Sequence, residues 1–356
     1  MKNLVFAIDG RQLDGNAHGG VQRFLYEILR ELDKIAAPEE YELILPENAA
    51  YQETYQNIRI VRTGKLSGLL WEQISLPLYL LQHHRYGIYP CSVVPYLYCP
   101  GIAVLHDIMF KTVPMVADSM KNPFLRFLLV WNYRTAARYA TLVGTVSEYS
   151  RQDIIKTYRI REEKVFLIGN GWNHITRIQP DDSWMQQHPE IVSGNYYFSL
   201  SANRVQKNFR WIYETARKNP DTLFVMAGTQ EEWQKKMEYD APNMIHLGFI
   251  TDGQIRSLMM HCKAFLFPSL YEGFGIPPME ALACGAKIVI ANASCLPEIY
   301  QKSACYIDPY DYNVNLDAVL QQKTAPAEQV LRRYTWNIAA KRLDAACKKI
   351  RKATAR

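Results

Sequence analysis

The segment PSLYEGFGIPPMEALACG, residues 268–285, decides how the second half of this 356-residue chain is interpreted. It follows the apolar run AFLF, residues 264–267, which has the short, aromatic composition of a buried strand. Pro277 and Pro278 suit the first turn of a helix, and Gly285 suits the position just after its end. The segment is therefore predicted to be a corner between a strand and a helix.

The two glutamates of this corner need a further explanation. Glu272 falls in the predicted loop and Glu280 in the predicted helix, so the two carboxylates cannot share a helix face. This disfavours an acid and base pair acting on one bond, as in glycosidases, and we expect the two side chains to contact different parts of one ligand. Gly273 and Gly275 let backbone N–H groups approach such a ligand closely. A purely structural corner explains the glycines and prolines but not a glutamate on each side.

Short β-branched and aromatic runs alternate with helical periodicity in both halves of the chain, which is typical of doubly wound α/β sheets. The strands predicted in the first half are residues 4–8, 41–45, 58–61, 102–106, 141–146 and 165–168. Those predicted in the second half are residues 196–200, 223–227, 244–247, 264–267, 287–290 and 305–307. The sequence therefore predicts an α/β protein with two Rossmann-like domains.

The polar residues 172–194, which include Pro180 and Pro189, are predicted to link these domains. We expect an N-terminal domain over residues 1–175 and a C-terminal domain over residues 176–337. A basic, strongly helical stretch follows the last strand. Its final part, at about residues 338–356, is expected to pack back on the first domain.

Composition narrows the class of protein. No apolar stretch reaches the roughly 20 residues that cross a bilayer, so we expect a cytoplasmic location. The 7 cysteines are odd in number and form no C-x-x-C, so neither a disulfide framework nor a zinc site is indicated. The net charge of +6 favours an acidic partner: nucleic acid, a sugar nucleotide or an anionic membrane face. Because the basic residues are dispersed and form no nucleic-acid-binding motif, a nucleic-acid partner is not expected.

The loop at residues 9–20 is a candidate phosphate site, because Gly19 and Gly20 lead into an amphipathic helix whose N-terminal N–H groups attract anions. It is not a P-loop, since Val21 and Gln22 stand where Lys and Ser or Thr are required. A glycine turn that only starts a helix explains the same residues.

Two other loops follow predicted strands, where ligands of open α/β sheets bind. His106 and Asp107 end one strand of the first half, and a structural histidine held by its neighbour is the alternative. In residues 199–208, Arg204 and Lys207 precede a helix and suit a diphosphate whose charge grows as it leaves. A solvated basic loop is the simpler interpretation of that pair.

Together these residues resemble retaining glycosyltransferases of the GT-B fold, in particular glycosyltransferase family 4. The resemblance extends over nearly the whole chain and rests on the E-x7-E signature Glu272 to Glu280, Arg204 with Lys207, Gly19-Gly20, His106-Asp107, TVSEYSRQDI from Thr145 and IGNGW from Ile168. It implies two Rossmann-like domains that face a cleft, which closes around a nucleotide diphosphate sugar.

The resemblance also implies roles for single residues. Glu272 would bond the donor sugar, Glu280 the ribose, and Arg204 with Lys207 the diphosphate, while His106 would lie near the reacting groups. The implied donor contacts are Gly19, Gly20, Asn203, Phe249, Ile250, Gly273, Phe274, Gly275, Ile276 and Glu280. No cofactor or metal is expected, which fits the absence of a D-x-D triplet from the sequence. Retention in this family is attributed to attack from the face that the phosphate leaves.

The acceptor is expected to bind the first domain. WEQISLP resembles a segment of bacterial polysaccharide transferases, so Trp71 and Glu72 are candidate acceptor contacts, together with Asp107. Residues 121–138 alternate basic and large apolar side chains, which suits a membrane carrying a lipid-linked acceptor and suits equally a helix with a basic solvent face.

The expected activity is retaining, metal-independent transfer of a sugar from a nucleotide diphosphate sugar to a growing bacterial surface glycan, such as O-antigen, capsule or lipopolysaccharide. A sugar-nucleotide 2-epimerase and a non-catalytic sugar-nucleotide-binding protein are the alternatives. Rhamnose, mannose, galactose, glucose and N-acetylglucosamine donors remain open, because base and hexose are read largely by backbone groups.

Overall fold

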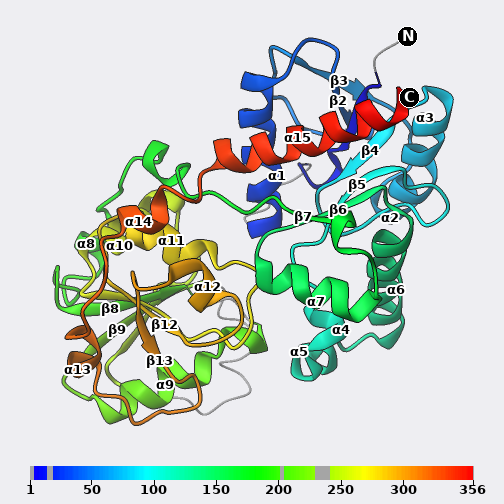
Figure 1. Cartoon of the computed structure of the whole chain (residues 1–356). Coiled ribbons are helices and arrows are strands. Elements are labelled where there is room, and N and C mark those ends of the chain that lie inside the picture. Colours follow the sequence, from blue (N-terminus) through cyan, green and yellow to red (C-terminus); the bar gives the residue numbers. More distant parts are fainter. Residues whose placement is uncertain (1–3, 14–18, 201–203, 229–240, 356) are drawn as a thin grey trace. The chain divides into compact units, whose positions relative to one another are not determined.

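The computed structural model describes residues 4–13, 19–200, 204–228 and 241–355, and divides into two compact units (Figure 1). The first unit contains Met1–Thr112, Met120–Gly171 and Trp336–Arg356. The second contains Val113–Ser119 and Trp172–Thr335. Each unit has its own parallel sheet, so the prediction of two doubly wound α/β domains is confirmed.

The sheet of the first unit has seven parallel strands in the order β3-β2-β1-β4-β5-β6-β7. The strands are β1 (Phe6–Asp9), β2 (Tyr41–Leu45), β3 (Ile58–Arg62), β4 (Tyr86–Tyr89), β5 (Gly101–Val104), β6 (Leu142–Thr145) and β7 (Val165–Leu167). The order reverses between β1 and β4, where Phe6 pairs with Tyr86 and Ile8 with Ile88. Such a reversal is where ligands of doubly wound sheets bind.

The helices of this unit cover the buried strands. They are α1 (Gly20–Ile35), α2 (Gly68–Leu70), α3 (Leu76–Gln82), α4 (Met109–Thr112), α6 (Pro123–Tyr139), α7 (Glu148–Tyr158) and α15 (Trp336–Thr354), with the π-helix η2 (Trp71–Ser75) between α2 and α3 and short 3-10 turns η1 (Arg11–Leu13) and η3 (Glu162–Lys164). The starts of α6 and α7 are capped by side chains, because Asn122 accepts from Phe124 N and Ser147 accepts from Ser150 N.

The sheet of the second unit has six parallel strands in the order β10-β9-β8-β11-β12-β13. The strands are β8 (Tyr196–Leu200), β9 (Leu223–Ala227), β10 (Met244–His246), β11 (Ala264–Phe267), β12 (Ile288–Ala291) and β13 (Cys305–Ile307). Its helices are α5 (Pro114–Ser119), α8 (Trp184–Gln187), α9 (Phe209–Lys218), α10 (Asp252–His261), α11 (Ile276–Ala283), α12 (Leu296–Tyr300), α13 (Leu316–Leu320) and α14 (Glu328–Leu331), with 3-10 turns η4 (Ile175–Arg177) and η5 (Val205–Lys207). Here the order reverses between β8 and β11.

Of the thirteen strands found in the described residues, twelve coincide, within two or three residues at each end, with runs that the sequence indicates, and β4 is the exception. Its sequence, YGIY, contains a glycine and is only four residues long, so it has neither alternation nor a sustained apolar run. The strand exists because β1 and β5 pair with it on both sides and bury Ile88 and Tyr89. Tertiary pairing therefore decides this element.

The polar residues 172–194, predicted to be a linker, pack on the second unit. Trp184 is fully buried and its Nε1 donates to Ser257 Oγ at 2.8 Å. Trp172 Nε1 donates to Leu331 O at 2.9 Å. The segment looks polar in sequence, but its two indole rings bury large apolar surfaces while their N–H groups find partners, which fixes it in place.

The C-terminal helix α15 packs against α1 in the first unit and crosses it in the view of Figure 1. Trp336 is fully buried and meets Phe24 of α1 edge to face, with ring centroids 6.2 Å apart. Tyr41 OH of β2 donates to Asp344 Oδ1 of α15 at 2.7 Å. Arg351 donates to Glu40 Oε1 at 2.9 Å and to Leu4 O at 3.0 Å. This helix, more than 300 residues downstream of β1, therefore completes the packing of the first sheet.

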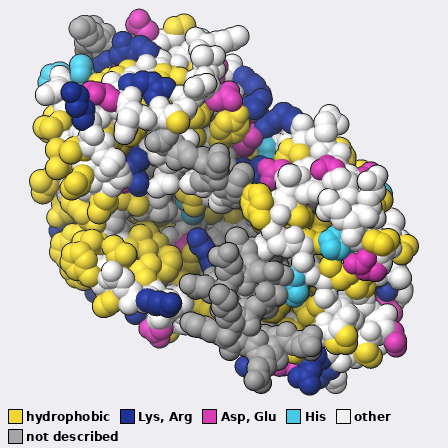
Figure 2. Space-filling view, turned by 180° about the vertical axis from the view of Figure 1, so that it is seen from behind, with side chains coloured by type: hydrophobic (Ala, Val, Ile, Leu, Met, Phe, Trp, Pro, Cys, Tyr) yellow, Lys and Arg dark blue, Asp and Glu magenta, His cyan; other side chains and the backbone are white. Residues whose placement is uncertain are grey.

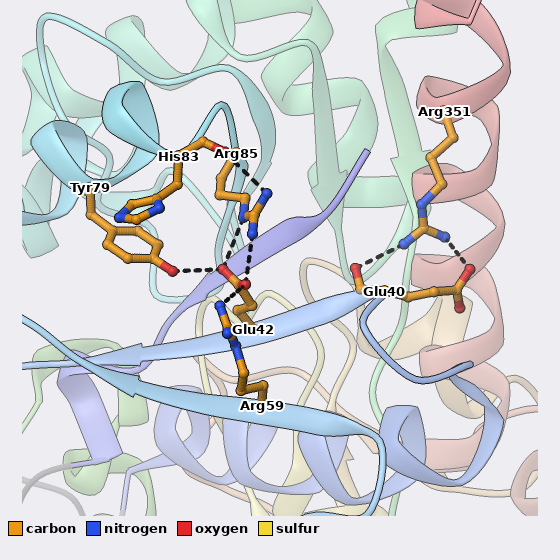
Figure 3. A network of polar contacts seen from close by, with 7 residues as sticks. All are labelled: Glu40, Glu42, Arg59, Tyr79, His83, Arg85 and Arg351. Carbon is orange, nitrogen blue, oxygen red and sulfur yellow. Dashed lines mark hydrogen bonds and ion pairs between the residues drawn. The ribbon is translucent and has the colours of Figure 1, made fainter. Parts of the chain in front are cut away.

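Glu42 of β2 is a charged residue that is almost wholly buried among polar partners (Figure 3). Arg85 holds both of its oxygens, with Nη2 2.9 Å from Oε1 and Nε 3.0 Å from Oε2. Arg59 Nη2 and Tyr79 OH also donate to it, at 2.5 and 2.8 Å. Burial by itself raises the pKa of Glu42, but the bonds from Arg85 and Tyr79 outweigh it, so the pKa ends below its usual range. The stability that this network contributes is thus present at neutral pH and is lost as the pH falls through the folded-state pKa.

Substitution of Trp336→Ala is expected to destabilise the first unit by about 3–5 kcal/mol, because it removes a fully buried ring from the contact of α15 with α1. Denaturant unfolding followed by circular dichroism measures the change. Lys349→Ala, at an exposed position of the same helix, is the control and should leave the midpoint unchanged. Equal midpoints for Trp336→Ala and the wild type would show that α15 does not stabilise the sheet.

Candidate functional site

The carboxyl ends of β8 and β11 form the reversal point of the second sheet, and their loops carry several of the predicted site residues. Arg204 and Lys207 follow β8, and Glu272 follows β11. Because β8 and β11 are adjacent, with Phe198 paired to Phe265, the two loops start side by side. The topology therefore gathers residues that lie more than 60 positions apart in the sequence.

Lys207 and Glu272 meet in this place. Lys207 Nζ lies 2.6 Å from Glu272 Oε1, and only 21% and 14% of the two side chains are exposed. The same ammonium lies over the Phe267 ring, 4.8 Å from its centroid. Partial burial strengthens each of these contacts relative to water. The structure thus brings together a cation and a carboxylate that are predicted to belong to one site. Arg204, three residues before Lys207, is exposed.

Backbone and amide hydrogen bonds fix the two loops to each other. Leu270 N donates to Gln206 O at 2.8 Å. Asn208 is buried, and its Nδ2 donates to Pro268 O at 3.1 Å and to Pro309 O at 2.8 Å. Its backbone is left-handed, with φ of 53°, a conformation that asparagine tolerates better than most residues. Sequence analysis did not single out Asn208, although an asparagine just before a helix is a recognisable signal.

The loop after β11 is the strand-to-helix corner that the sequence predicts. Gly275 has φ of +85°, and a Cβ there would lie 2.9 Å from Leu296 Cδ2, so a glycine is required. Its carbonyl oxygen accepts a short hydrogen bond from Tyr300 OH. Glu272 N donates to Ser294 Oγ at 3.0 Å. These contacts hold the backbone of the corner, including Phe274 at its buried centre, in one conformation.

Glu280 lies on α11, and only 8% of it is exposed. Its Oε1 accepts a hydrogen bond of 2.7 Å from Nε2 of His174, which is buried in the segment after Gly171. The sequence analysis missed His174 because it follows no strand and belongs to no catalytic motif. Its only signal was its place two residues after the IGNGW stretch. His174 thus fixes the position of the Glu280 carboxylate.

Four of the predicted donor contacts lie outside the loops that follow β8 and β11. Gly19 precedes α1 and its N–H donates to Gln22 Oε1 at 3.2 Å, while Gly20 is the first residue of the helix. Phe249 and Ile250 lie between β10 and α10, with 68% of Phe249 exposed. Asn203 lies outside the described residues. The roles of all five residues remain predictions.

His106 follows β5 and is buried. Its Nε2 donates a hydrogen bond of 2.8 Å to Pro90 O. The Phe24 ring packs edge to face against the imidazole, with the ring centroids 4.7 Å apart. Burial lowers the pKa of His106 to about 4, so the ring is neutral at pH 7. Asp107 Oδ1 accepts from Met109 N at 3.0 Å and caps α4. If His106 acts on a substrate, it does so as a neutral imidazole through Nδ1.

The two candidate acceptor contacts on η2 are buried in the first unit. Trp71 is fully enclosed and its Nε1 donates to Thr63 O at 2.7 Å. Glu72 Oε2 lies 2.7 Å from Arg11 Nη2. Burial, together with the charge of Asp9 at the end of β1, raises the pKa of Glu72 to about 8. Asp9 ends β1 at the β1/β4 reversal, the kind of place where doubly wound sheets bind ligands.

Within the described part of the chain, no group of three or more His, Cys, Asp or Glu residues is arranged to hold a metal ion. No helix in those same residues is long and apolar enough to cross a membrane.

Comparison with known proteins shows what the segment that carries these loops is similar to. Residues 181–326, which contain the loops after β8 and β11, match the family described as glycosyl transferases group 1. O-antigen chain mannosyltransferase B of Escherichia coli is 24% identical over 85% of this chain and 86% of its own. O-antigen chain mannosyltransferase RfbU of Salmonella typhimurium is 26% identical over 70% of this chain and 69% of its own. The solved structure of HepE from Anabaena in complex with UDP and glucose superposes with a TM-score of 0.65, 18% identity and 99% coverage of both chains.

The two parallel sheets and the matched domain define a glycosyltransferase of the GT-B fold, as the sequence analysis predicts. The protein is accordingly a hexosyltransferase-type enzyme. More particularly, the two bacterial relatives described above, which align over most of their length, are named as mannosyltransferases of O-antigen chains.

Loss of the His174 contact is expected to affect both stability and the site. His174→Ala leaves the buried Glu280 carboxylate without this donor and should lower the free energy of unfolding by about 1.5–3 kcal/mol. A double-mutant cycle with Glu280→Gln measures the coupling of the pair.

The matched control is His188→Ala, which removes a histidine from an exposed contact with Glu190 and should change little. A coupling near zero between His174 and Glu280 would show that the contact does not position the carboxylate.

Proposed function

We propose that this enzyme transfers mannose, with retention and without a metal ion, from a nucleoside diphosphate mannose to a growing O-antigen-type surface glycan. The mannosyltransferase names of the two bacterial relatives support the sugar and the glycan. The contact of Lys207 with Glu272 at the β8/β11 reversal, inside the matched domain, is the observation that carries the proposal.

In this proposal the Lys207 ammonium and the Arg204 guanidinium bind the donor diphosphate. As the bond between the anomeric carbon and the phosphate oxygen breaks, negative charge accumulates on the leaving group, and two fixed cations stabilise it more than they stabilise the ground state. Lys207 is already held by Glu272 and Phe267, so little rotamer freedom is lost when the donor arrives.

Glu272 is proposed to bond hydroxyls of the donor sugar, and Glu280, held by His174, to accept from the ribose. The N–H groups of Phe274 and Gly275, just before α11, and of Ile276, its first residue, complete the donor contacts in this proposal. The base is proposed to lie near Phe249 and Ile250. Ser294 and Tyr300 hold the backbone of the corner through Glu272 N and Gly275 O.

The acceptor hydroxyl is proposed to attack the anomeric carbon from the face that the diphosphate leaves. The new carbon–oxygen bond forms as the old one breaks, and the acceptor proton passes to the departing phosphate oxygen. No protein nucleophile is required, so Glu272 serves to position the sugar and to stabilise its developing positive charge.

The first unit is proposed to contribute the acceptor side through His106 and Asp107, with Gly19 and Gly20 near the phosphates. Trp71 and Glu72, which the sequence suggested as acceptor contacts, are fully buried in that unit and are not proposed to touch the acceptor. The acceptor is proposed to be lipid-linked, and the reaction to take place in the cytoplasm, where nucleotide sugars are made. A 2-epimerase or a non-catalytic binder remains the alternative. Donor incubated without acceptor would be epimerised only by the first of these.

Each of the substitutions Lys207→Ala, Arg204→Ala and Glu272→Ala is expected to lower kcat/KM with GDP-mannose by at least about tenfold, since each removes one charge-assisted contact. Lys302→Ala, an exposed lysine of the same unit, is the control. Wild-type rates for all three variants would contradict the site, and transfer from UDP-glucose but not from GDP-mannose would contradict the donor.

Transfer is expected to continue at an undiminished rate in excess EDTA, because the two cations replace a divalent ion at the diphosphate. Activity is measured before and after dialysis against the chelator. Loss of activity that Mg²⁺ or Mn²⁺ restores would show that the enzyme needs a metal.

A further inference from the structure

The first unit exposes a row of large aliphatic side chains on α2, η2 and α3. The row begins at Leu66, just before α2, and its residues, spaced mostly three or four apart, are 37–60% exposed: Leu66, Leu69, Leu70, Ile74, Leu78 and Leu81. Trp71, Leu76 and Leu80, on the opposite face of the same segment, are fully buried. The segment is therefore apolar on both sides, whereas a helix that only covers a sheet has a polar outer face.

Helix α6 has the same character. Its inner side buries Asn132, Tyr133 and Ala136, while Phe124, Leu125, Phe127 and Trp131 are 48–64% exposed. The side chain of Leu97, in the loop before β5, is 97% exposed. These residues and the row on α2, η2 and α3 are called the apolar face below.

Hydrogen bonds connect η2 and α6 through the loop before β5. Gln73 of η2 donates through Nε2 to Val94 O at 3.1 Å and accepts from Tyr96 N at 2.8 Å. Asn132 of α6 donates through Nδ2 to Val94 O at 2.8 Å and accepts from Val94 N at 3.0 Å. Residues 94–96, which precede Leu97, are thus hydrogen-bonded both to η2 and to α6. Figure 2 shows hydrophobic side chains gathered along the edge of the molecule at the left of the view, where these helices lie.

The two stretches of sequence that carry the apolar face contain many more cations than carboxylates, although the exposed Asp118 lies just before the second stretch. Within residues 63–97 and 120–139 the only carboxylate is Glu72, which is buried beside Arg11. The same stretches contain Lys65, Lys121, Arg126, Arg134 and Arg138. The Arg134 guanidinium lies over the Trp131 ring, 5.8 Å from its centroid. A protein surface normally mixes both signs, so this composition points to an anionic, apolar partner.

A second copy of the chain fits this surface poorly. A two-fold contact would bring the cations of these stretches close to their copies in the second chain, which costs electrostatic energy. A bilayer with anionic lipids offers hydrocarbon for the leucines and phenylalanines and negative headgroups for the cations. Trp131 suits the boundary between the two, because an indole has an apolar body and one N–H donor.

We propose that the apolar face of α2, η2, α3 and α6 docks the first unit on the surface of an anionic lipid bilayer. The side chains of this face enter the boundary between headgroups and acyl chains, and Lys121, Arg134 and their neighbours contact the headgroups. The proposal stands independently of the sugar that the enzyme transfers, because neither donor nor acceptor takes part in the contact.

Co-sedimentation of the full chain with vesicles tests the proposal. The wild type is expected to bind vesicles of phosphatidylethanolamine with phosphatidylglycerol, and to bind phosphatidylcholine vesicles at least about tenfold more weakly. Leu70→Glu and Phe124→Glu, at exposed positions, are each expected to lower the partition coefficient on the anionic vesicles at least about tenfold. Circular dichroism confirms that both variants fold.

The matched control is Val192→Glu, which places the same charge at an exposed apolar position of the second unit and should bind like the wild type. Equal binding of all variants, or no binding of the wild type, would overturn the proposal. So would a dimer, seen by light scattering, that Leu70→Glu dissociates, because the face would then bind a second copy. None of these readings depends on transfer activity, so a wrong donor assignment would leave them unchanged.

Discussion

A parallel sheet whose strand order reverses once places the loops of its two central strands next to each other at one edge. In the second unit this constraint joins the loop after β8 to the loop after β11. Lys207 and Glu272 meet there at 2.6 Å only because β8 and β11 are neighbours in space. The hydrogen bonds of Asn208 and Ser294 then hold the two loops at fixed positions, so that a charged pair can remain partly buried.

Buried carboxylates in both units have hydrogen-bond partners, because a buried charge without a partner of fixed geometry is costly. In the first unit Glu42 accepts from two arginines and a tyrosine, and Tyr41 OH reaches Asp344 on the returning helix. In the second unit His174 donates to Glu280. The networks of the first unit join β2 to its surroundings, whereas the pair in the second unit orients a carboxylate at the site.

The first unit combines a well-packed interior with helices that remain apolar on their outer side. Trp71 and Leu80 face the core while Leu70 and Leu78 face outward from the same segment. A folding requirement explains only the inner residues. The outer ones lower solubility unless they have a partner, and this is the physical reason to connect them with a membrane surface.

The sequence by itself determined the alternation of strands and helices, the corner at residues 268–285, and the likeness of its glutamates and cations to a glycosyltransferase. These are local properties: proline and glycine fix turns, and apolar periodicity fixes helices and strands. Only the tertiary structure decided that YGIY is a strand, that residues 172–194 pack on the second unit, and that His174 holds Glu280. Each of these depends on contacts between residues far apart in the chain, whose energies no local pattern contains.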